Sequence, residues 1–179
     1  MSEFIGEIGS LFCYVKEWKE YLNDIKLVSI DGSTQKTGIA YFCNGKYVEH
    51  VLLNFSKDKN MENRFESMSK EIWKILDGYR PNIIYIEETY MANNPQTSKI
   101  LTRLQGVVYA WCINNACEFN TIRPTSWRKQ LNFQQGKNVK REQLKKQSLQ
   151  YVLDNYGLEV TDDEADAICI ADAVLKMFK

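Results

Sequence analysis

Histidine and paired cysteines are scarce in this sequence. The only histidine in 179 residues, His50, lies in an alternating strand-like run, which predicts a surface strand residue rather than a catalytic base. A Ser-His-Asp or Cys-His mechanism would rest wholly on this residue, and no companion motif accompanies it. The five cysteines are odd in number and scattered, without a CxxC pair. They argue against a disulfide framework or a zinc site and favour a reducing compartment.

Long apolar runs and linkers are also missing. No stretch reaches the length of a membrane span, and the N-terminus lacks the basic region and cleavage pattern of a signal peptide. We therefore expect a cytoplasmic protein with no membrane partner. No segment rich in Pro, Gly or Ser divides the chain. We expect one domain over residues 26–179, preceded by an amphipathic helix over residues 1–25 whose apolar residues recur every three or four positions.

Net charge is zero, but the charged residues are segregated. The 23 basic and 23 acidic side chains cancel. Residues 123–147 hold eight Lys or Arg against a single acid, whereas residues 154–172 hold seven acids and no Lys or Arg. A protein that holds a polyanion with one surface and divalent metal with another needs such an arrangement. Two solvated helix faces of opposite sign would give the same pattern.

The rest of the chain is organised around residues 27–42. Two apolar, β-branched runs flank a polar turn that contains glycine, which predicts a strand, a turn and a second strand running back beside the first. Asp31 ends the first strand, where its carboxylate would be desolvated unless a cation pairs with it. The alternative is that Asp31 caps the turn through an Asx-type hydrogen bond.

The remaining elements follow from periodicity and turn residues. Asn44-Gly45 is typical of a two-residue hairpin turn, so the chain should begin with a three-stranded antiparallel meander. The order of elements then predicts an α/β fold, in which a mixed sheet is flanked by helices. We expect a helix with an apolar face from Met61 to Leu76, a strand over 82–87, a helix over 97–116, a strand over 119–122, a short helix from about Thr125, a helix ending near Tyr156 and a terminal helix.

The terminal helix has a defined start. Thr161 and Glu164 form a capping box, so this helix should begin at about Asp162. Asp163 and Asp166 then share one face of its first turn. Acids at this position also suit the helix dipole, which is an explanation without chemistry. It does not explain why strands should end in acids at Asp31 and at Glu87.

Four carboxylates from two strands and one helix suggest a metal site. Oxygen ligands without nearby His or Cys favour Mg²⁺ or Mn²⁺ over zinc. Such a set can hold two ions about 3.5–4 Å apart, the spacing used for phosphodiester hydrolysis. One ion would lower the pKa of the attacking water and the other would stabilise the leaving 3′ oxygen, so that no protein nucleophile is needed.

Three acidic stretches resemble the motifs of the RuvC family of Holliday-junction resolvases, in the family's order and at similar spacing over residues 26–178. They are Ile30-Asp31-Gly32-Ser33 with Thr37-Gly38, then Tyr85-Ile86-Glu87-Glu88-Thr89-Tyr90, and Asp163-Glu164-Ala165-Asp166-Ala167-Ile168. The resemblance implies an RNase H-like fold and a structure-selective endodeoxyribonuclease. It would resolve four-way or branched DNA junctions by paired nicks, in DNA recombination and repair, with two Mg²⁺ or Mn²⁺ ions per site. The implied catalytic and metal-binding residues are Asp31, Glu87, Asp163 and Asp166, and Glu88, Asp162 and Glu164 are the neighbours that an error of register would promote.

The resemblance also implies how DNA and a second copy would be bound. The family works as a homodimer, whose contact falls on the helix from Ser98 to Ile113. An aromatic that enters the junction centre matches Tyr90. The expected DNA-binding residues are Tyr90, Arg128, Lys129, Lys137, Lys140 and Arg141, and Tyr79, Trp127 and Phe133 are further candidates for base stacking.

Departures from the cellular enzymes point to divergent phage members. The turn after Asp31 lacks Pro-Gly, the N-terminal helix is an addition, and the basic segment is denser. Three alternatives stay open at this stage. A sugar kinase or actin-like ATPase shares an Asp-Gly-Ser loop but needs two such domains, which 179 residues cannot supply. A non-catalytic junction-binding protein and an RNase H-like nuclease that acts on RNA are the other two.

Overall fold

The computed structural model describes residues 24–89 and 95–178. Tyr90 lies outside the described residues, as does the expected N-terminal helix apart from its last two positions. Those two, Asp24 and Ile25, are not helical. Ile25 is 1% exposed in the core, and its carbonyl accepts a hydrogen bond from the Asn44 N–H at 2.7 Å. The predicted helix therefore extends too far at this end, because Ile25 leads into the sheet. The division between residues 1–25 and 26–179 stays a prediction.

A mixed five-stranded sheet, in the order β3-β2-β1-β4-β5, forms the centre of the molecule. The first three strands are antiparallel, and β4 and β5 continue the sheet parallel to β1. The turn between β2 and β3 has positive φ at Asn44 (55°) and Gly45 (71°), as the predicted two-residue hairpin requires. The strands are β1 (Lys26–Asp31), β2 (Lys36–Cys43), β3 (Lys46–Asn54), β4 (Ile83–Glu87) and β5 (Glu118–Ile122).

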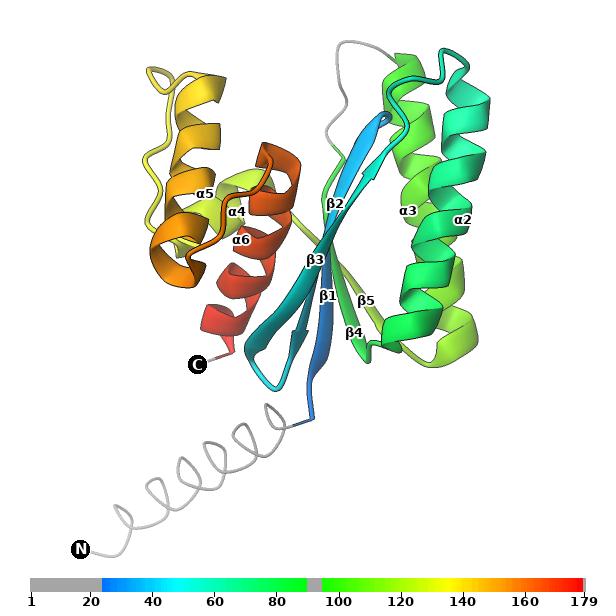
Figure 1. Cartoon of the computed structure of the whole chain (residues 1–179), viewed down its shortest axis with the longest axis horizontal. Coiled ribbons are helices and arrows are strands. Elements are labelled where there is room, and N and C mark those ends of the chain that lie inside the picture. The colour runs from blue at the N-terminus through cyan, green and yellow to red at the C-terminus, as the bar shows by residue number, and fades with distance from the viewer. Residues whose placement is uncertain (1–23, 90–94, 179) are drawn as a thin grey trace, which may run out of the picture.

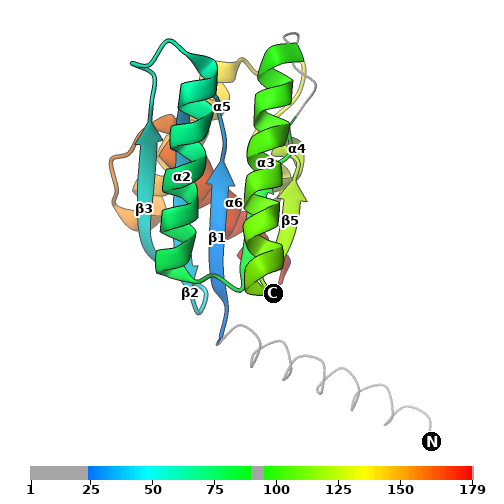
Figure 2. The same cartoon turned by 90° about the vertical axis from the view of Figure 1, so that its right-hand side faces the viewer.

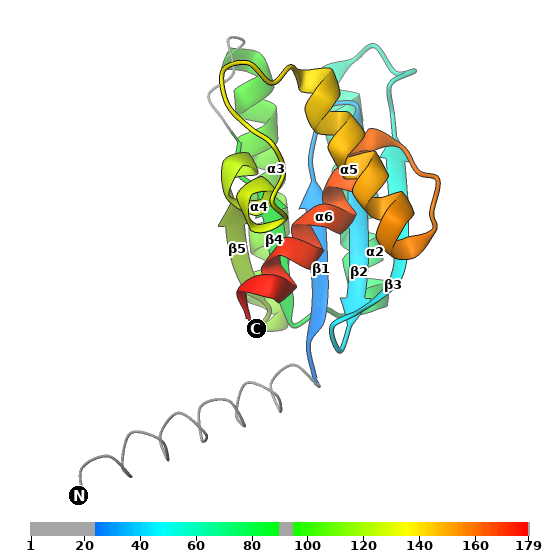
Figure 3. The same cartoon turned by 90° about the vertical axis from the view of Figure 1, so that its left-hand side faces the viewer.

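Helices cover both faces of this sheet, which confirms the predicted fold class. Two long helices, α2 and α3, lie side by side on one face (Figure 2). The shorter α4, α5 and α6 lie on the other face, where α6 crosses the strands (Figures 1 and 3). None of the helices in the described ranges is long and apolar enough to cross a membrane. Their bounds are α2 (Met61–Tyr79), α3 (Pro95–Asn115), α4 (Pro124–Gln130), α5 (Arg141–Tyr156) and α6 (Asp162–Met177).

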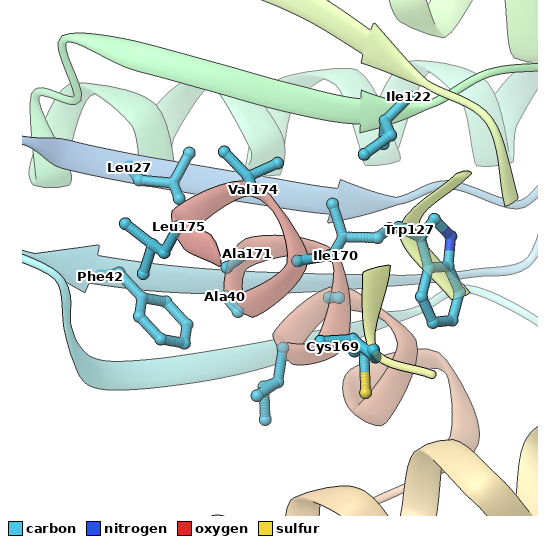
Figure 4. Close-up of a cluster of buried hydrophobic side chains, with 14 of the residues drawn as sticks. Leu27, Ala40, Phe42, Ile122, Trp127, Cys169, Ile170, Ala171, Val174 and Leu175 are labelled. Atoms are coloured by element: carbon cyan, nitrogen blue, oxygen red, sulfur yellow. The ribbon is translucent and has the colours of Figure 1, made fainter. Parts of the chain in front are cut away.

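The two faces have separate hydrophobic cores. The core under α2 and α3 is built from large side chains, among them Ile72, Leu104 and Trp111. The core under α6 contains many small residues, including four buried alanines of that helix. Trp127 lies at one end of this second core, and Phe42 and Leu175 lie at the other (Figure 4).

A glycine lets the start of α6 approach the sheet. Gly38 pairs with Asp31 across β1 and β2. A Cβ atom at Gly38 would lie 2.0 Å from the backbone carbonyl oxygen of Asp163, far inside van der Waals contact. Only a residue without a side chain therefore allows the first turn of α6 to lie beside the end of β1.

Candidate active site

Strand alternation directs Asp31 toward α6. Two residues earlier on the same face of β1, the Ser29 hydroxyl donates a hydrogen bond to the carbonyl of Ala167 in α6 at 2.7 Å. Glu87 ends the neighbouring strand β4, which is parallel to β1 and in register with it through Ile30 and Ile86. The two acids therefore leave the sheet at the same edge.

The predicted capping box brings the third element to this edge. The Thr161 N–H donates to Glu164 Oε2 at 2.8 Å, and the Glu164 N–H donates to Thr161 Oγ1 at 3.5 Å. The box starts α6 at Asp162, as predicted, and places Asp163 and Asp166 in its first two turns. Satisfying the free N–H groups in this way fixes the beginning of the helix against the strand ends.

One cavity of about 290 Å³ collects the four predicted acids. They come from β1, β4 and α6, with basic residues of α4 and α5 facing them across the same space. The cavity is lined by Asp31, Glu87, Pro124, Arg128, Arg141, Leu144, Lys145, Asp162, Asp163 and Asp166.

Burial and neighbouring carboxylates raise the pKa of all four acids. Burial is the largest cause for each of them. The pKa of Asp31 is raised furthest above its usual range, because the carboxylates of Glu87, Asp166 and Asp163 add to the effect of burial. Arg128 acts in the opposite direction on Asp31, Glu87 and Asp166. Such a set of carboxylates is stabilised in its charged form by added cations.

Arg128 lies among the acids and forms an ion pair with Asp166. Its Nη2 is 3.8 Å from Asp166 Oδ2, and its guanidinium lies 4.6 Å from the centre of the Trp127 ring. Both Arg128 Nε and Asp166 Oδ1 are buried without a hydrogen-bond partner. A buried carboxylate oxygen without a donor is a candidate for a ligand that carries positive charge.

The donor set fits a hard divalent cation. It consists of carboxylate oxygens alone, the ligands that Mg²⁺ and Mn²⁺ prefer. Within the described part of the chain, no three His, Cys, Asp or Glu side chains are already placed to share one ion. The four acids line one cavity nonetheless, and Asp166 Oδ1 has no other partner there. The residues present could therefore hold a metal after side-chain adjustment.

The three neighbouring acids have other partners. Glu88 Oε2 accepts a hydrogen bond from Arg123 Nε at 3.0 Å, outside the cavity. Asp162 lines the cavity, but its carboxylate is paired with the Lys145 ammonium. Glu164 is occupied by the capping box. Each of these three acids therefore already has a partner, and the register of the four catalytic acids stays a prediction.

His50 is more buried than the sequence predicted. Its Nε2 lies 3.5 Å from Glu164 Oε1, its Nδ1 lies 2.5 Å from the Tyr47 hydroxyl, and its side chain is 21% exposed. It lies on β3 and does not line the cavity.

The predicted DNA-binding residues divide into two groups. Arg128 and Arg141 line the cavity. Lys129, Lys137 and Lys140 are exposed on α4, on the loop after it and at the start of α5.

The predicted stacking role of Trp127 is wrong, because its ring is 0% exposed. Tyr79 stacks on Tyr41 at a centroid distance of 4.5 Å, at the end of α2 on the other face of the sheet. Phe133 is partly buried with its ring at 75° to that of Trp127. None of the three is placed as a free platform for bases.

Sequence reasoning missed two contributors to the site. Lys145 lines the cavity one helical turn after Arg141, and this four-residue spacing was a signal for a shared face. Trp127 donates a hydrogen bond from its indole Nε1 to Glu87 Oε2 at 2.8 Å. No feature of the sequence pairs these two residues, which are 40 positions apart.

Comparison with known proteins decides the family. The sequence model of the family described as crossover junction endodeoxyribonuclease RuvC matches residues 27–173. The chain belongs to the RuvC family. The RuvC of Fusobacterium nucleatum is 31% identical over 153 residues, which cover 82% of this chain and 77% of the relative. The RuvC of Rickettsia akari is 26% identical over 137 residues, which cover 76% and 82% respectively.

A solved structure confirms the RuvC fold. Thermus thermophilus RuvC, in complex with a Holliday junction substrate, superposes with a TM-score of 0.65 and 15% sequence identity. The superposition covers 83% of this chain and 92% of that protein. The five-stranded sheet and the helices on its two faces therefore have the arrangement of the RuvC fold.

Proposed function

We propose that this chain is a metal-dependent endodeoxyribonuclease that cuts four-way or branched DNA junctions. The observation that carries the proposal is the single cavity in which carboxylates from β1, β4 and α6 meet two arginines, in a chain of the RuvC family. Asp31, Glu87, Asp163 and Asp166 are the proposed catalytic residues and metal ligands. The proposed cofactor is Mg²⁺ or Mn²⁺, with two ions in each site.

The carboxylates and the arginines of the cavity have different proposed roles. When bound, two such ions supply a more acidic water and stabilise the leaving 3′ oxygen. The four carboxylates hold the ions, and the free Oδ1 of Asp166 is available for this purpose. Arg128 and Arg141 face the acids across the cavity, where a guanidinium can bind a phosphate through paired N–H groups.

The exposed lysines extend this site into a DNA-binding surface. Lys129, Lys137 and Lys140 lie on α4, the following loop and the start of α5, the same elements that supply Arg128 and Arg141. Contacts of this kind read the phosphate backbone and orient the duplex, and they carry no sequence information by themselves. We also propose that Tyr90 enters the junction.

A homodimer is part of the proposal. The expected contact segment lies within α3, on the face of the sheet away from α6. Tyr109 and Ile113 of this helix are 52% and 65% exposed, and large apolar side chains at such exposure favour a protein contact. Two copies would present two active sites, which paired nicks require.

The other candidate functions receive less support. A protein that only binds junctions has no need for four carboxylates with raised pKa values in one cavity. Repulsion between carboxylates would destabilise its fold without contributing to catalysis. A nuclease for RNA differs in how it contacts the sugar, and the acids themselves do not distinguish the two substrates. Substrate comparison separates these cases.

Asp31→Asn tests the proposed function. Wild type, this variant and Glu88→Gln are incubated with a synthetic four-way DNA junction, a linear duplex, a flap and an RNA–DNA hybrid in Mg²⁺. We expect Asp31→Asn to lose cleavage and to keep junction binding in a gel-shift assay, since it removes a metal ligand and leaves the basic surface intact. Glu88→Gln should cut normally, because Glu88 pairs with Arg123 outside the cavity.

Each result of this assay has a defined meaning. Symmetric paired nicks confined to the four-way junction indicate a resolvase acting as a dimer, and cutting of several branched substrates indicates a broader debranching nuclease. Normal cleavage by Asp31→Asn contradicts the assigned site. Tight junction binding without cleavage by wild type, in both Mg²⁺ and Mn²⁺, favours the binding-protein alternative.

A further inference from the structure

Trp127 is a core residue that donates a hydrogen bond to an acid of the cavity. It is 0% exposed, and Phe133 and the Arg128 guanidinium lie against its ring at centroid distances of 5.9 and 4.6 Å. A buried indole N–H needs an acceptor, whereas a phenylalanine could fill an apolar space without one. The acceptor here is Oε2 of Glu87, at 2.8 Å, inside the acidic cavity.

The rest of Glu87 is fixed through its backbone. Its carbonyl accepts a hydrogen bond from the Gln105 side chain at 3.0 Å, and the next N–H, of Glu88, bonds to Ile122 at 2.8 Å. These contacts hold the end of β4, but they do not set the orientation of the Glu87 carboxylate. In the described part of the chain, the indole N–H of Trp127 is the hydrogen-bond donor to that carboxylate.

We propose that Trp127 is a positioning residue, which orients the Glu87 carboxylate through its indole N–H so that Oε1 is directed toward the metal site. The inference rests on the proposed function. Groups that bond to a metal ligand from outside the metal site commonly set that ligand's orientation, and their loss weakens metal affinity about 10- to 100-fold. The close packing around the ring makes Trp127 a rigid donor, which is what orientation of a ligand requires.

A second buried tryptophan provides a matched control. Trp111 is also 0% exposed, and its Nε1 donates to Asp77 Oδ1 at 2.9 Å. This pair joins α3 to α2 on the other face of the sheet, and neither residue lines the acidic cavity. Trp111→Phe and Trp127→Phe therefore remove the same kind of hydrogen bond and a similar volume, at two places that differ in their relation to the acids.

The test measures metal binding as well as cleavage. Binding of Mn²⁺ alone is followed by the loss of the free-ion electron paramagnetic resonance signal, with wild type, Trp127→Phe and Trp111→Phe at equal folded concentration. We expect Trp127→Phe to weaken Mn²⁺ binding about 10-fold or more, and to raise the Mg²⁺ concentration for half-maximal junction cleavage in parallel. Trp111→Phe should stay within about 2-fold of wild type on both measures, although both variants lose stability.

A second measurement is made on the wild-type chain and does not depend on how well Trp127→Phe folds. The indole N–H resonance of Trp127 is identified in ¹⁵N-tryptophan-labelled protein by elimination, with phenylalanine variants of Trp18, Trp73 and Trp111. It should shift during a Mg²⁺ titration and saturate with the metal, while the Trp111 resonance stays in place.

The outcomes separate this inference from the proposed function. Wild type that binds Mn²⁺ and cuts junctions, together with a Trp127→Phe variant no weaker than Trp111→Phe or an unmoved Trp127 resonance, overturns the positioning role and leaves the nuclease intact. Wild type that neither binds Mn²⁺ nor cuts any junction overturns the proposed function itself.

Discussion

The helices on the two faces of the sheet differ in how many small side chains they bury. On the face covered by α2 and α3, the core is made of large residues such as Ile72 and Leu104. On the opposite face, α6 contributes four buried alanines. Gly38 in β2 has no side chain, which leaves room for the backbone of α6 at Asp163. The distance between packed elements depends on the side chains at the contact. Small residues therefore bring the acids of α6 to the strand ends, while the large residues stabilise the fold at a distance from them.

Each face also buries one tryptophan that donates to a carboxylate. Trp111 donates to Asp77 at 2.9 Å between two helices, and Trp127 donates to Glu87 at 2.8 Å at the end of a strand. The contacts are nearly equal in length, but only Glu87 lines the cavity with Asp31 and the acids of α6. The neighbours of a contact, more than its geometry, therefore decide whether it serves packing or a site.

The same substitution should have different effects on the two faces, and the larger effect is expected for Gly38→Ala. Its Cβ would meet a backbone oxygen of Asp163 at 2.0 Å, so α6 must move. Because a displacement of about 1 Å can lower a rate about 100-fold, we expect cleavage to fall by that order. Overpacking should lower the free energy of unfolding by roughly 1–3 kcal/mol. Single-turnover cleavage and urea unfolding measure the two effects.

Gly78→Ala, in α2 on the other face, is the control. Nothing lies within 4 Å of a Cβ at Gly78, and alanine is favoured over glycine within a helix. Cleavage should be unchanged, and the free energy of unfolding should stay the same or rise by up to about 1 kcal/mol. Wild-type cleavage by Gly38→Ala would show that close approach of α6 is not what positions Asp163.

Basic residues of the two faces should differ in their effect on junction binding. We expect Lys140→Ala with Arg141→Ala to weaken binding and to reduce the slope of log affinity against log salt by up to about 2, one for each lost phosphate contact. Lys70→Ala with Lys74→Ala, on the exposed surface of α2, should leave the slope unchanged. Fluorescence anisotropy from low to moderate salt measures both slopes. An unaltered slope in the first variant would place the DNA surface elsewhere.

Much of the fold could be predicted because its signals are local. The turn at Asn44-Gly45, the capping box of Thr161 and Glu164, and the apolar periodicity of α2 each depend on residues within a few positions of one another. The four acids could be predicted as a group as well, since strand ends and a helix start each place them at a known end of an element. Parallel pairing of β1 with β4 then brings those ends together.

What could not be predicted depends on contacts between distant segments. The bond from Trp127 to Glu87 spans 40 positions, and the pairing of Lys145 with Asp162 spans 17. Trp127 is a further candidate for base stacking from the sequence, whereas its burial depends on how α4 packs against α6. Ile25 fits the apolar periodicity of the predicted N-terminal helix, but it lies in the core directly before the first residue of β1.

The smallest predicted effect concerns stability without metal. Burial and the neighbouring carboxylates raise the pKa of Asp31 in the folded chain above its unfolded value. The folded chain therefore holds this proton to higher pH than the unfolded chain does. The stability that this group contributes is complete in acid and is lost as pH rises through the folded pKa.

Asp31→Asn should accordingly be more stable than wild type at neutral pH in EDTA, by roughly 0.5–2 kcal/mol, as is common when a strained active-site charge is removed. The difference should shrink as pH falls through the carboxyl range, because wild type then becomes neutral at this position. Mg²⁺ should raise the melting temperature of wild type and not of the variant. Asp77→Asn, on the other face, should give no such gain, because Asp77 accepts a bond from Trp111. Equal stability of wild type and Asp31→Asn across this pH range would contradict a raised pKa of Asp31 in the folded chain, to which burial contributes most and the neighbouring carboxylates add.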